Sequence, residues 1–370
     1  MAPPAMKRFF AGVVLLLTSL VADAAVAPGP FRVAIVGLDH GHVDWVLADT
    51  LKRTDVQLVG VVEPKAALAA EFAERFKIPE ALRFSDLEQM LDTERPEGVM
   101  VFTSTFAHAE VVAKCAAHGV HVMMEKPLAV SMEHARAMET AAREHSIHVL
   151  VNYETTWYPS HELAFTLARR QGAVGGLRKF VVRDGHNGPK EIGCPESFLV
   201  WLTDPVLNGG GALTDFGCYG ADLITWLMEG ERPLRVTAVT HQFKPEIYPH
   251  VDDDATILLT YPRAEGVIQA SWNWPIGRKD MDIYGVTGAI EVANRDTLRL
   301  RTAGGVAQDL KPTPLAPPLD EPVAYFSAVV RGEIPVHPLS SLETNMIVTE
   351  ILDAARESAR TGRSVELPEK

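Results

Sequence analysis

The chain has 370 residues, of which 47% are hydrophobic and 22% are charged. This length predicts two domains, and the balance of apolar and charged residues supports folded cores and excludes global disorder. The net charge of −13, from 48 acidic against 35 basic residues, argues against nucleic-acid binding, because neutralising phosphates requires a basic surface.

The first 27 residues have the pattern of a secretory signal. Lys7 and Arg8 precede an apolar run over residues 9–22, and small residues follow through Ala27. Such a sequence is typical of a cleaved signal peptide, and the run is shorter than the roughly 20 residues of a membrane span. We expect residues 1–27 to be removed and the mature protein to be exported to the periplasm with no membrane anchor. An uncleaved anchor is the alternative, and the degraded twin-arginine pattern leaves the export route open.

From residue 31 onward, runs of strand type alternate with helical segments. The expected strands cover residues 31–36, 56–62, 98–102, 121–124 and 147–151. The expected helices cover residues 43–52, 64–76, 107–118 and 131–145. Alternation of this kind predicts βαβ units and a parallel sheet covered on both faces. We therefore assign residues 28–151 to an α/β, doubly wound Rossmann domain.

After about residue 152 the pattern changes to longer, adjacent strands. These are expected at residues 177–183, 234–243, 255–261, 266–272 and 281–286, with one helix at 215–228 among them. Adjacent strands predict an α+β domain over residues 152–340, with a large, open and mainly antiparallel sheet. A last helix, expected at 341–361, would pack the segment 341–370 back on the core.

The turn after the first strand is a candidate nucleotide site. Gly37 follows the strand and Gly41 opens the next helix, which suits a pyrophosphate. The dinucleotide fingerprint is broken, because Asp39 and His42 stand where glycines are expected, and an ordinary strand–helix turn is the alternative. Glu63 ends the second strand, where an acid can bind the ribose hydroxyls and repel a 2′-phosphate. This favours NAD, with NADP as the alternative because Lys65 lies close; a solvated acid is the other interpretation of Glu63.

Two further segments carry candidate catalytic groups. The sequence Glu125-Lys126-Pro127 follows a strand that ends at the carboxyl edge of the predicted sheet, where such folds bind ligands. Three glycines at 209–211 lead to Asp215 and Tyr219, which are four residues apart and would share one face of a helix. A third strand end, at residues 102–105, leads toward His108.

These motifs, in this order, resemble the glucose–fructose oxidoreductase / inositol dehydrogenase / rhizopine-catabolism (Gfo/Idh/MocA) family. The likeness is carried by Val36-Gly37, the loop reaching His108, Gly119-Val120-His121, Glu125-Lys126-Pro127 and the triple glycine with Asp215 and Gly217. The resemblance implies that Lys126 contacts the reacting sugar hydroxyl and that Asp215 places it. Tyr219 stands where the family has His or Tyr, so the chain looks like the tyrosine branch.

For the reaction, we expect Tyr219 to accept the hydroxyl proton, because an adjacent Lys126 ammonium would favour its phenolate. Asp215 would orient the pair. Lys126 as the base, or a purely structural Tyr219, are the alternatives.

The expected cofactor contacts come from the turn and the strand ends: Gly37, Asp39, His40, Gly41, His42, Glu63, Thr103, Ser104, Thr105, His108, Glu125 and Lys126. The expected substrate contacts are Tyr153, Trp157, His186 and Trp201, because aromatic rings suit a pyranose, although core packing is the alternative for any single Trp. His40 and His42 depart from the small residues that the family has in the turn. No metal is expected, since the histidines lack a helical H-x-x-x-H spacing and the three cysteines form no C-x-x-C pair.

The sequence thus predicts an exported NAD(P)-dependent oxidoreductase that acts on a sugar or polyol hydroxyl. A redox-neutral glycosidase or lyase with permanently bound NAD is the first alternative, since free NAD is scarce outside the cytoplasm. A catalytically dead sugar-binding relative is the second. The resemblance also implies a homo-oligomer, a dimer or tetramer formed through the open sheet of the second domain.

Overall fold

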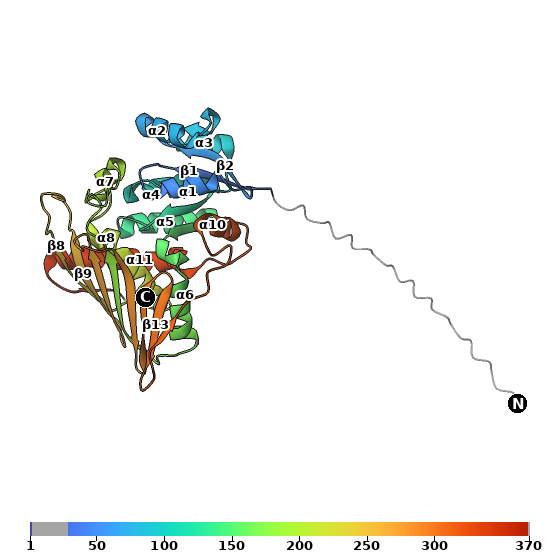
Figure 1. Ribbon diagram of the computed structural model, residues 1–370. Coiled ribbons are helices and arrows are strands. Elements are labelled where there is room, and N and C mark those ends of the chain that lie inside the picture. The colour runs from blue at the N-terminus through green and yellow to red at the C-terminus, as the bar shows by residue number, and fades with distance from the viewer. Residues whose placement is uncertain (2–28, 369–370) are drawn as a thin grey trace.

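In the computed structural model, which describes Met1 and residues 29–368, six parallel strands form the first sheet in the order β3-β2-β1-β4-β5-β6 (Figure 1). Their bounds are β1 Phe31–Val36, β2 Val56–Val62, β3 Arg83–Phe84, β4 Gly98–Val101, β5 His121–Glu125 and β6 Val149–Asn152. Continuous apolar runs such as those of β1 and β4 form strands here because both faces of the sheet are covered. The expected signal peptide lies outside the described residues.

Helices cover both faces of this sheet. One face packs against α3 (Leu87–Glu94), α4 (His108–Ala117) and α5 (Met132–His145), and the other packs against α1 (Val43–Thr50) and α2 (Ala66–Phe76). Helix α10 (Pro322–Val330) joins the second face, where Phe326 touches the position of Gly98 and stacks edge-on against Phe31. A late segment of the chain therefore completes the Rossmann layer.

The second sheet has nine strands in the order β14-β13-β12-β11-β7-β10-β9-β8-β15. Their bounds are β7 Leu177–Gly185, β8 Arg235–His241, β9 Asp254–Thr260, β10 Glu265–Ser271, β11 Arg278–Gly285, β12 Gly288–Asn294, β13 Thr297–Thr302, β14 Gln308–Leu310 and β15 Val365–Glu366. Within the described part of this second sheet, only β7 and β10 pair in parallel, and the other pairs are antiparallel. The expected fold class, a Rossmann domain with a mainly antiparallel second sheet, is confirmed.

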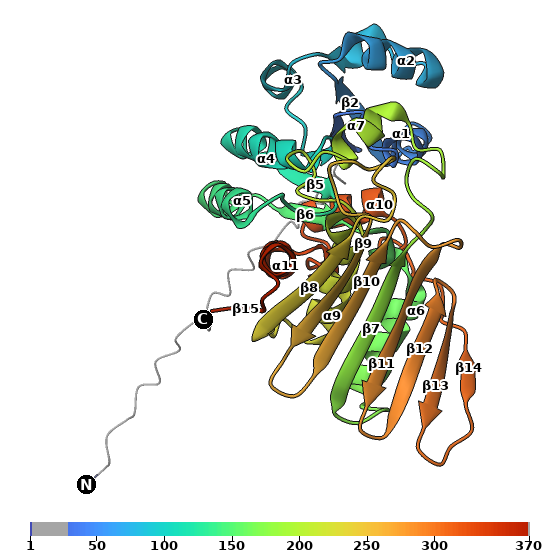
Figure 2. The same cartoon turned by 90° about the vertical axis from the view of Figure 1, so that its left-hand side faces the viewer.

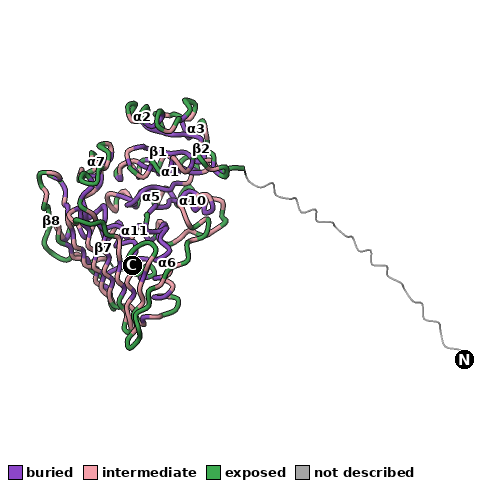
Figure 3. The backbone as a smooth tube through the Cα atoms, viewed as in Figure 1, coloured by how far each residue is buried: buried purple, intermediate pink, exposed green. Residues whose placement is uncertain are grey.

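One face of the second sheet is covered by helices and the other is open (Figure 2). The remaining helices are α6 Pro159–Phe165, α7 Glu196–Leu202, α8 Ala212–Asp215, α9 Gly217–Leu227 and α11 Leu342–Thr361. The alternating burial along β9 shows that only one face is in the core. Figure 3 shows the buried positions along the strands of the first sheet and exposure at the far end of the second. Helix α11 packs against α5, α9 and β8, so it joins the two domains.

The helix expected at residues 215–228 is in fact two helices. Helix α8 ends at Asp215 and α9 begins at Gly217, with Phe216 between them. Asp215 and Tyr219 therefore do not lie one turn apart on a single helix, and that part of the expectation is wrong. In the described part of the chain, no helix has the length and apolar character needed to cross a membrane.

Candidate active site

The carboxyl ends of β1, β4 and β5 bring three of the predicted segments to one edge of the first sheet. Gly37 has φ +81°, and a Cβ there would lie 2.5 Å from Thr103 Cγ2, so only glycine fits this approach of the two strands. The amide of His40 donates to the Phe102 carbonyl over 3.1 Å, which fixes the turn against the end of β4.

A pocket beside this turn fits the adenosine end of NAD. It has a volume of about 440 Å³, and the residues that line it include Gly37, Asp39, Glu63, Thr103 and Ser104. Buried Glu63 accepts the amides of Leu38 (2.9 Å) and Lys65 (2.8 Å); burial raises the pKa of its carboxyl. The two lysines that line this pocket are both paired with carboxylates, Lys65 with Asp39 and Lys114 with Glu110, each at 2.7 Å, which favours NAD over NADP.

The side chains of two predicted cofactor residues form hydrogen bonds within the protein. The Thr105 hydroxyl donates to Asn208 Oδ1 over 3.2 Å. His108 is buried, its Nδ1 lies 3.1 Å from the Leu128 carbonyl oxygen, and burial lowers its pKa to about 4. Both side chains hold the strand-end loops in place, and their contact with a cofactor stays a prediction.

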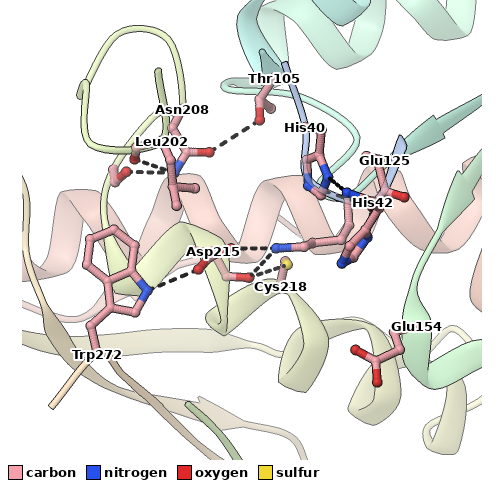
Figure 4. A network of polar contacts seen from close by, with 12 residues as sticks. His40, His42, Thr105, Glu125, Glu154, Leu202, Asn208, Asp215, Cys218 and Trp272 are labelled. Atoms are coloured by element: carbon pink, nitrogen blue, oxygen red, sulfur yellow. Dashed lines mark hydrogen bonds and ion pairs between the residues drawn. The ribbon is translucent and has the colours of Figure 1, made fainter. Parts of the chain in front are cut away.

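Lys126 and Asp215 form a buried ion pair at the domain crevice. Lys126 Nζ lies 2.5 Å from Asp215 Oδ1, and Trp272 Nε1 donates to Asp215 Oδ2 over 3.0 Å (Figure 4). Burial alone would lower the pKa of Lys126, but the adjacent carboxylate raises it above the usual value. The same pairing overcomes the effect of burial on Asp215 and lowers the pKa of that carboxyl. Lys126 is therefore an ammonium that can donate to a substrate oxygen.

Tyr219 lies beside this pair, but its surroundings favour the protonated phenol. Lys126 Nζ is 5.1 Å from the centre of its ring, and Lys279 Nζ is 4.5 Å away. Even so, burial raises the pKa of Tyr219 well above its usual value, and the nearby Asp184 and Glu154 carboxylates raise it further. The electrostatic argument for a phenolate is therefore not supported, and the role of Tyr219 as proton acceptor stays a prediction.

The turn histidines both approach Glu125. His42 Nδ1 lies 3.1 Å from Glu125 Oε2, whereas His40 Nε2 lies 3.9 Å from the same oxygen. Burial lowers the pKa of His40 to about 3, and its ring packs edge-on against Phe198 of α7. Among the described residues, His40, His42 and Glu125 are the one group of three whose side-chain donor atoms lie close enough together for a metal ion.

A second pocket, of about 320 Å³, opens between the domains next to the ion pair. The residues that line it are His40, Gly41, His42, Lys126, His186, Pro189, Ile192, Cys194, Phe198, Leu202, Asp215, Phe216, Tyr219 and Lys279. Of the predicted substrate residues, His186 is in this lining. Tyr153, Trp157 and Trp201 are buried outside it, so their contact with a substrate stays a prediction.

Several residues of the site were missed by the sequence analysis, and three of them, Lys279, Asp252 and Asn208, have contacts that explain their part in it. Lys279 lines the pocket from β11, and its position follows only from the pairing of β11 with β7. The Asp252 carboxylate accepts the amides of Gly211 (2.9 Å) and Leu213 (2.7 Å), which anchors the triple glycine before Asp215. Asn208 holds Thr105. For Asp252, the run of three acidic residues at 252–254 was a sequence feature that could have indicated a functional position. The sequence has no comparable feature at Lys279 or Asn208.

The site combines a nucleotide turn with a strand-end lysine that pairs with an aspartate, and a pocket lies beside both. These features are those of an NAD(P)-dependent oxidoreductase. Residues 31–153 match the family model described as an oxidoreductase family with an NAD-binding Rossmann fold, and residues 167–291 match that of the Gfo/Idh/MocA C-terminal domain. The chain belongs to the Gfo/Idh/MocA oxidoreductase family, which confirms the resemblance seen in the sequence.

Individual relatives agree with this assignment. A trans-1,2-dihydrobenzene-1,2-diol dehydrogenase of Xenopus laevis is 30% identical over 67% of this chain and 71% of its own. The structure of GenD2 from gentamicin A biosynthesis, in complex with NAD, has 25% identity and a TM-score of 0.76 over 95% of this chain and all of the other. The aldose–aldose oxidoreductase of Caulobacter crescentus shares the fold, at 23% identity and a TM-score of 0.76 over 91% of this chain and all of the other.

Proposed function

We propose that this protein oxidises a secondary hydroxyl of a sugar or sugar-like polyol, with NAD as the hydride acceptor. The observation that carries the proposal is the buried Lys126–Asp215 pair, which lines a pocket between the nucleotide turn and the second domain. A pocket of about 320 Å³ is at the small end of ligand sites, and the solved structure of an aldose–aldose oxidoreductase has the same fold.

Each residue of the pair has a distinct part in this chemistry. The nicotinamide, when bound, supplies the acceptor for the hydride. Lys126 donates a hydrogen bond to the substrate oxygen and stabilises the negative charge that develops there, while Asp215 holds the ammonium in place through Oδ1. The Trp272 indole fixes the other oxygen of Asp215, so the pair is oriented before the substrate binds.

The activity is tested by incubating residues 28–370 with NAD and a panel of aldoses, levoglucosan and myo-inositol, and following reduced nucleotide by absorbance. Oxidation of at least one member, lost in Lys126→Met, supports the proposal. No nucleotide reduction with any member counts against it. An active Lys126→Met variant would remove the lysine from the chemistry.

The cofactor and its exchange need a separate measurement. The chain is purified without added nucleotide and denatured, and any released nucleotide is identified by mass spectrometry. Stoichiometric NAD means a resident cofactor and favours the redox-neutral glycosidase or lyase, or a self-recycling oxidoreductase. An empty protein that binds added NAD is an ordinary dehydrogenase, and one that binds neither NAD nor NADP contradicts the proposal.

Export to the periplasm and assembly through the open sheet complete the proposal. The basic and apolar start of the chain supports export, and fractionation of cells that produce the full chain tests it, since recovery only in the cytoplasm would contradict export. The face of the nine-stranded sheet that no helix covers (Figure 2) supports a homo-oligomer. A monomeric mass in light scattering would contradict this oligomer.

A further inference from the structure

The pocket beside the Lys126–Asp215 pair has one wall that is almost free of polar side chains. This wall comes from the segment 186–202, which follows β7 and ends with α7. Apart from His186, the side chains that the segment contributes to the lining are apolar or only weakly polar. We call them the apolar wall: Pro189, Ile192, Cys194, Phe198 and Leu202. A free sugar carries hydroxyls around its whole ring, and this wall offers them no strong hydrogen-bond partner.

The loop that carries part of the apolar wall is held in place by the segment after β8. Lys244 Nζ donates to the Asn187 carbonyl over 2.6 Å and to Glu191 Oε1 over 2.5 Å. The Tyr248 hydroxyl donates to Glu191 Oε2. The Glu191 carboxylate is therefore paired outside the pocket lining, and the apolar wall is formed before any ligand binds, which lowers the cost of binding.

The polar groups of the same pocket have few hydrogen bonds left for a substrate. Lys126 Nζ donates to Asp215 Oδ1 over 2.5 Å and to the Asp215 carbonyl over 3.1 Å, so one of its three hydrogens remains for the reacting oxygen. Lys279 is paired with Glu154. Burial lowers the pKa of His186, and its Nδ1 accepts a backbone amide over 2.9 Å, so the neutral ring keeps one donor, Nε2–H. These groups suit the hydroxyls on one side of a sugar ring, and the other side would meet the apolar wall.

Apolar side chains that border this pocket are also exposed to solvent. Ile192 lines the pocket and is 54% exposed. The Trp45 side chain is 45% exposed, and its ring centre lies 6.1 Å from that of the lining residue His42. Apolar surface therefore continues from the pocket to the outside, and an apolar group attached to the sugar would cover it.

Two phenylalanines of the lining favour an aromatic group. Phe198 belongs to the apolar wall, and Phe216 lies between α8 and α9. The Phe216 ring is edge-on to His186, with ring centres 5.0 Å apart, and its centre is 5.9 Å from Lys126 Nζ. Aromatic rings attract one another through edge-on and offset contacts in addition to the area that they bury.

We propose that the substrate is an aryl glycoside, a sugar whose anomeric carbon carries an aromatic group that rests on the apolar wall. The inference rests on the proposed function and leaves its chemistry unchanged, because the oxidised hydroxyl lies at Lys126 and the glycosidic bond stays intact. The polar groups then bind the sugar, while the aromatic group takes the place of hydroxyls that would have no partner. A free sugar should react less well, since a buried hydroxyl without a hydrogen bond is unfavourable.

The first test compares matched substrates with the purified protein and NAD. Initial rates of nucleotide reduction are measured for an aldose, for its phenyl glycoside in both anomers, and for a disaccharide in which a second sugar replaces the phenyl ring. We expect kcat/KM for one phenyl anomer to exceed the values for the aldose and the disaccharide by about 10–100-fold. The disaccharide controls for size, because its second ring is polar. An aldose or disaccharide that reacts as well as the phenyl glycosides overturns the proposal.

The second test changes the apolar wall at its most exposed position. Ile192→Gln puts a polar group where the aromatic ring would rest, so kcat/KM for the phenyl glycoside should fall by about 10-fold, with the value for the free sugar and the KM for NAD unchanged. Val200→Gln is the matched control, because Val200 is 59% exposed on α7 and lies outside the lining. It should keep wild-type rates.

Three results with Ile192→Gln would overturn the proposal. They are an unchanged rate with the phenyl glycoside, an equal loss with the phenyl glycoside and the free sugar, and a rise confined to the KM for NAD. The last result would mean that the apolar wall faces the nicotinamide.

Binding without turnover separates this inference from the proposed function. With NADH in place of NAD, the protein cannot oxidise a substrate, and calorimetry measures the Kd of the phenyl glycoside and of the free sugar. Tighter binding of the phenyl glycoside, weakened in Ile192→Gln, supports the aromatic site. If no compound then reduces the nucleotide, the proposed function alone has failed. Oxidation of the free sugar, with no preference for phenyl glycosides in rate or in binding, leaves the proposed function standing and overturns this inference.

Discussion

Asp215 illustrates how a buried charge at this site depends on its hydrogen-bonded partner. Asp215→Asn removes the carboxylate that pairs with Lys126 and leaves the buried ammonium without its hydrogen-bonded counter-charge. We expect the free energy of unfolding to fall by about 3–5 kcal/mol, and kcat/KM to fall because Lys126 is no longer held. Thermal unfolding and steady-state kinetics measure the two effects.

The control for this variant is the exposed pair of Arg360 and Glu357 on α11. Glu357→Gln should leave the stability nearly unchanged, since exposed ion pairs contribute little. Equal losses in both variants would contradict the view that burial, and not charge pairing as such, makes the Lys126–Asp215 pair important.

Asp184 predicts a pH dependence of stability. Burial raises the pKa of its carboxyl from the ordinary 3.8 to about 8 in the folded protein. The folded state therefore holds a proton that the unfolded state releases, so this contribution is fully present below about pH 4 and is lost as the pH rises through about 8. Asp184→Asn cannot ionise and should lose less stability than the wild type between pH 5 and pH 9.

Melting temperatures of both proteins across this range test the prediction. Glu144→Gln, which changes an exposed carboxylate on α5, should keep the wild-type dependence. Parallel curves for the wild type and Asp184→Asn would show that Asp184 is ionised in the folded protein.

At the scale of elements, the triple glycine and the short helix α8 decide where Asp215 lies. A Cβ at Gly211 would be 1.8 Å from the Asp252 carbonyl oxygen, so Gly211→Ala must push the backbone away from the segment before β9. We expect a loss of stability of about 2 kcal/mol or more and a displaced Asp215, seen as a fall in both melting temperature and activity.

Gly277→Ala is the matched control, because a Cβ at Gly277 meets nothing within 4 Å. It should be close to neutral in both measurements. A neutral Gly211→Ala would mean that the contact with Asp252 can relax without moving Asp215.

Most strands and helices of the first domain could be predicted from the sequence, while β3, α3 and the junction of α8 and α9 could not. The buried strands β1, β2 and β4 are short, mostly apolar runs, interrupted only by Arg32 and Gln57, and such runs are typical of a parallel sheet that is covered on both faces. The apolar pattern continues through Phe216, so nothing local marks the break between the two helices. Contact with Asp252, which lies far along the chain, sets the start of α8.

At the scale of the whole molecule, the open sheet face predicts self-association. Val181, Val267 and Leu258 are direct neighbours on adjacent strands, and all three are half-buried on the face without helices. Val267→Lys places a charge at the centre of this row and should convert an oligomer into a monomer with an intact fold. Light scattering and circular dichroism measure both properties.

Val306→Lys is the control for added charge, because Val306 is 86% exposed in the loop before β14. It should keep the mass of the wild type. An oligomeric Val267→Lys variant would place the interface elsewhere on the molecule.

The sequence by itself determined the family, the Rossmann domain and the segments that meet at the site, because the glycine turn, Glu125-Lys126-Pro127 and Asp215 are local signals tied to strand ends. Only the tertiary structure decided what these side chains do to one another. Burial and neighbouring charges, which come from the packing of two domains, favour a protonated Tyr219, lock Lys126 to Asp215 and direct His42 toward Glu125. Spacing along a chain carries no information about such desolvation or about a partner on another strand, and so the sequence could name the residues of the site without showing how their neighbours shift their pKa values.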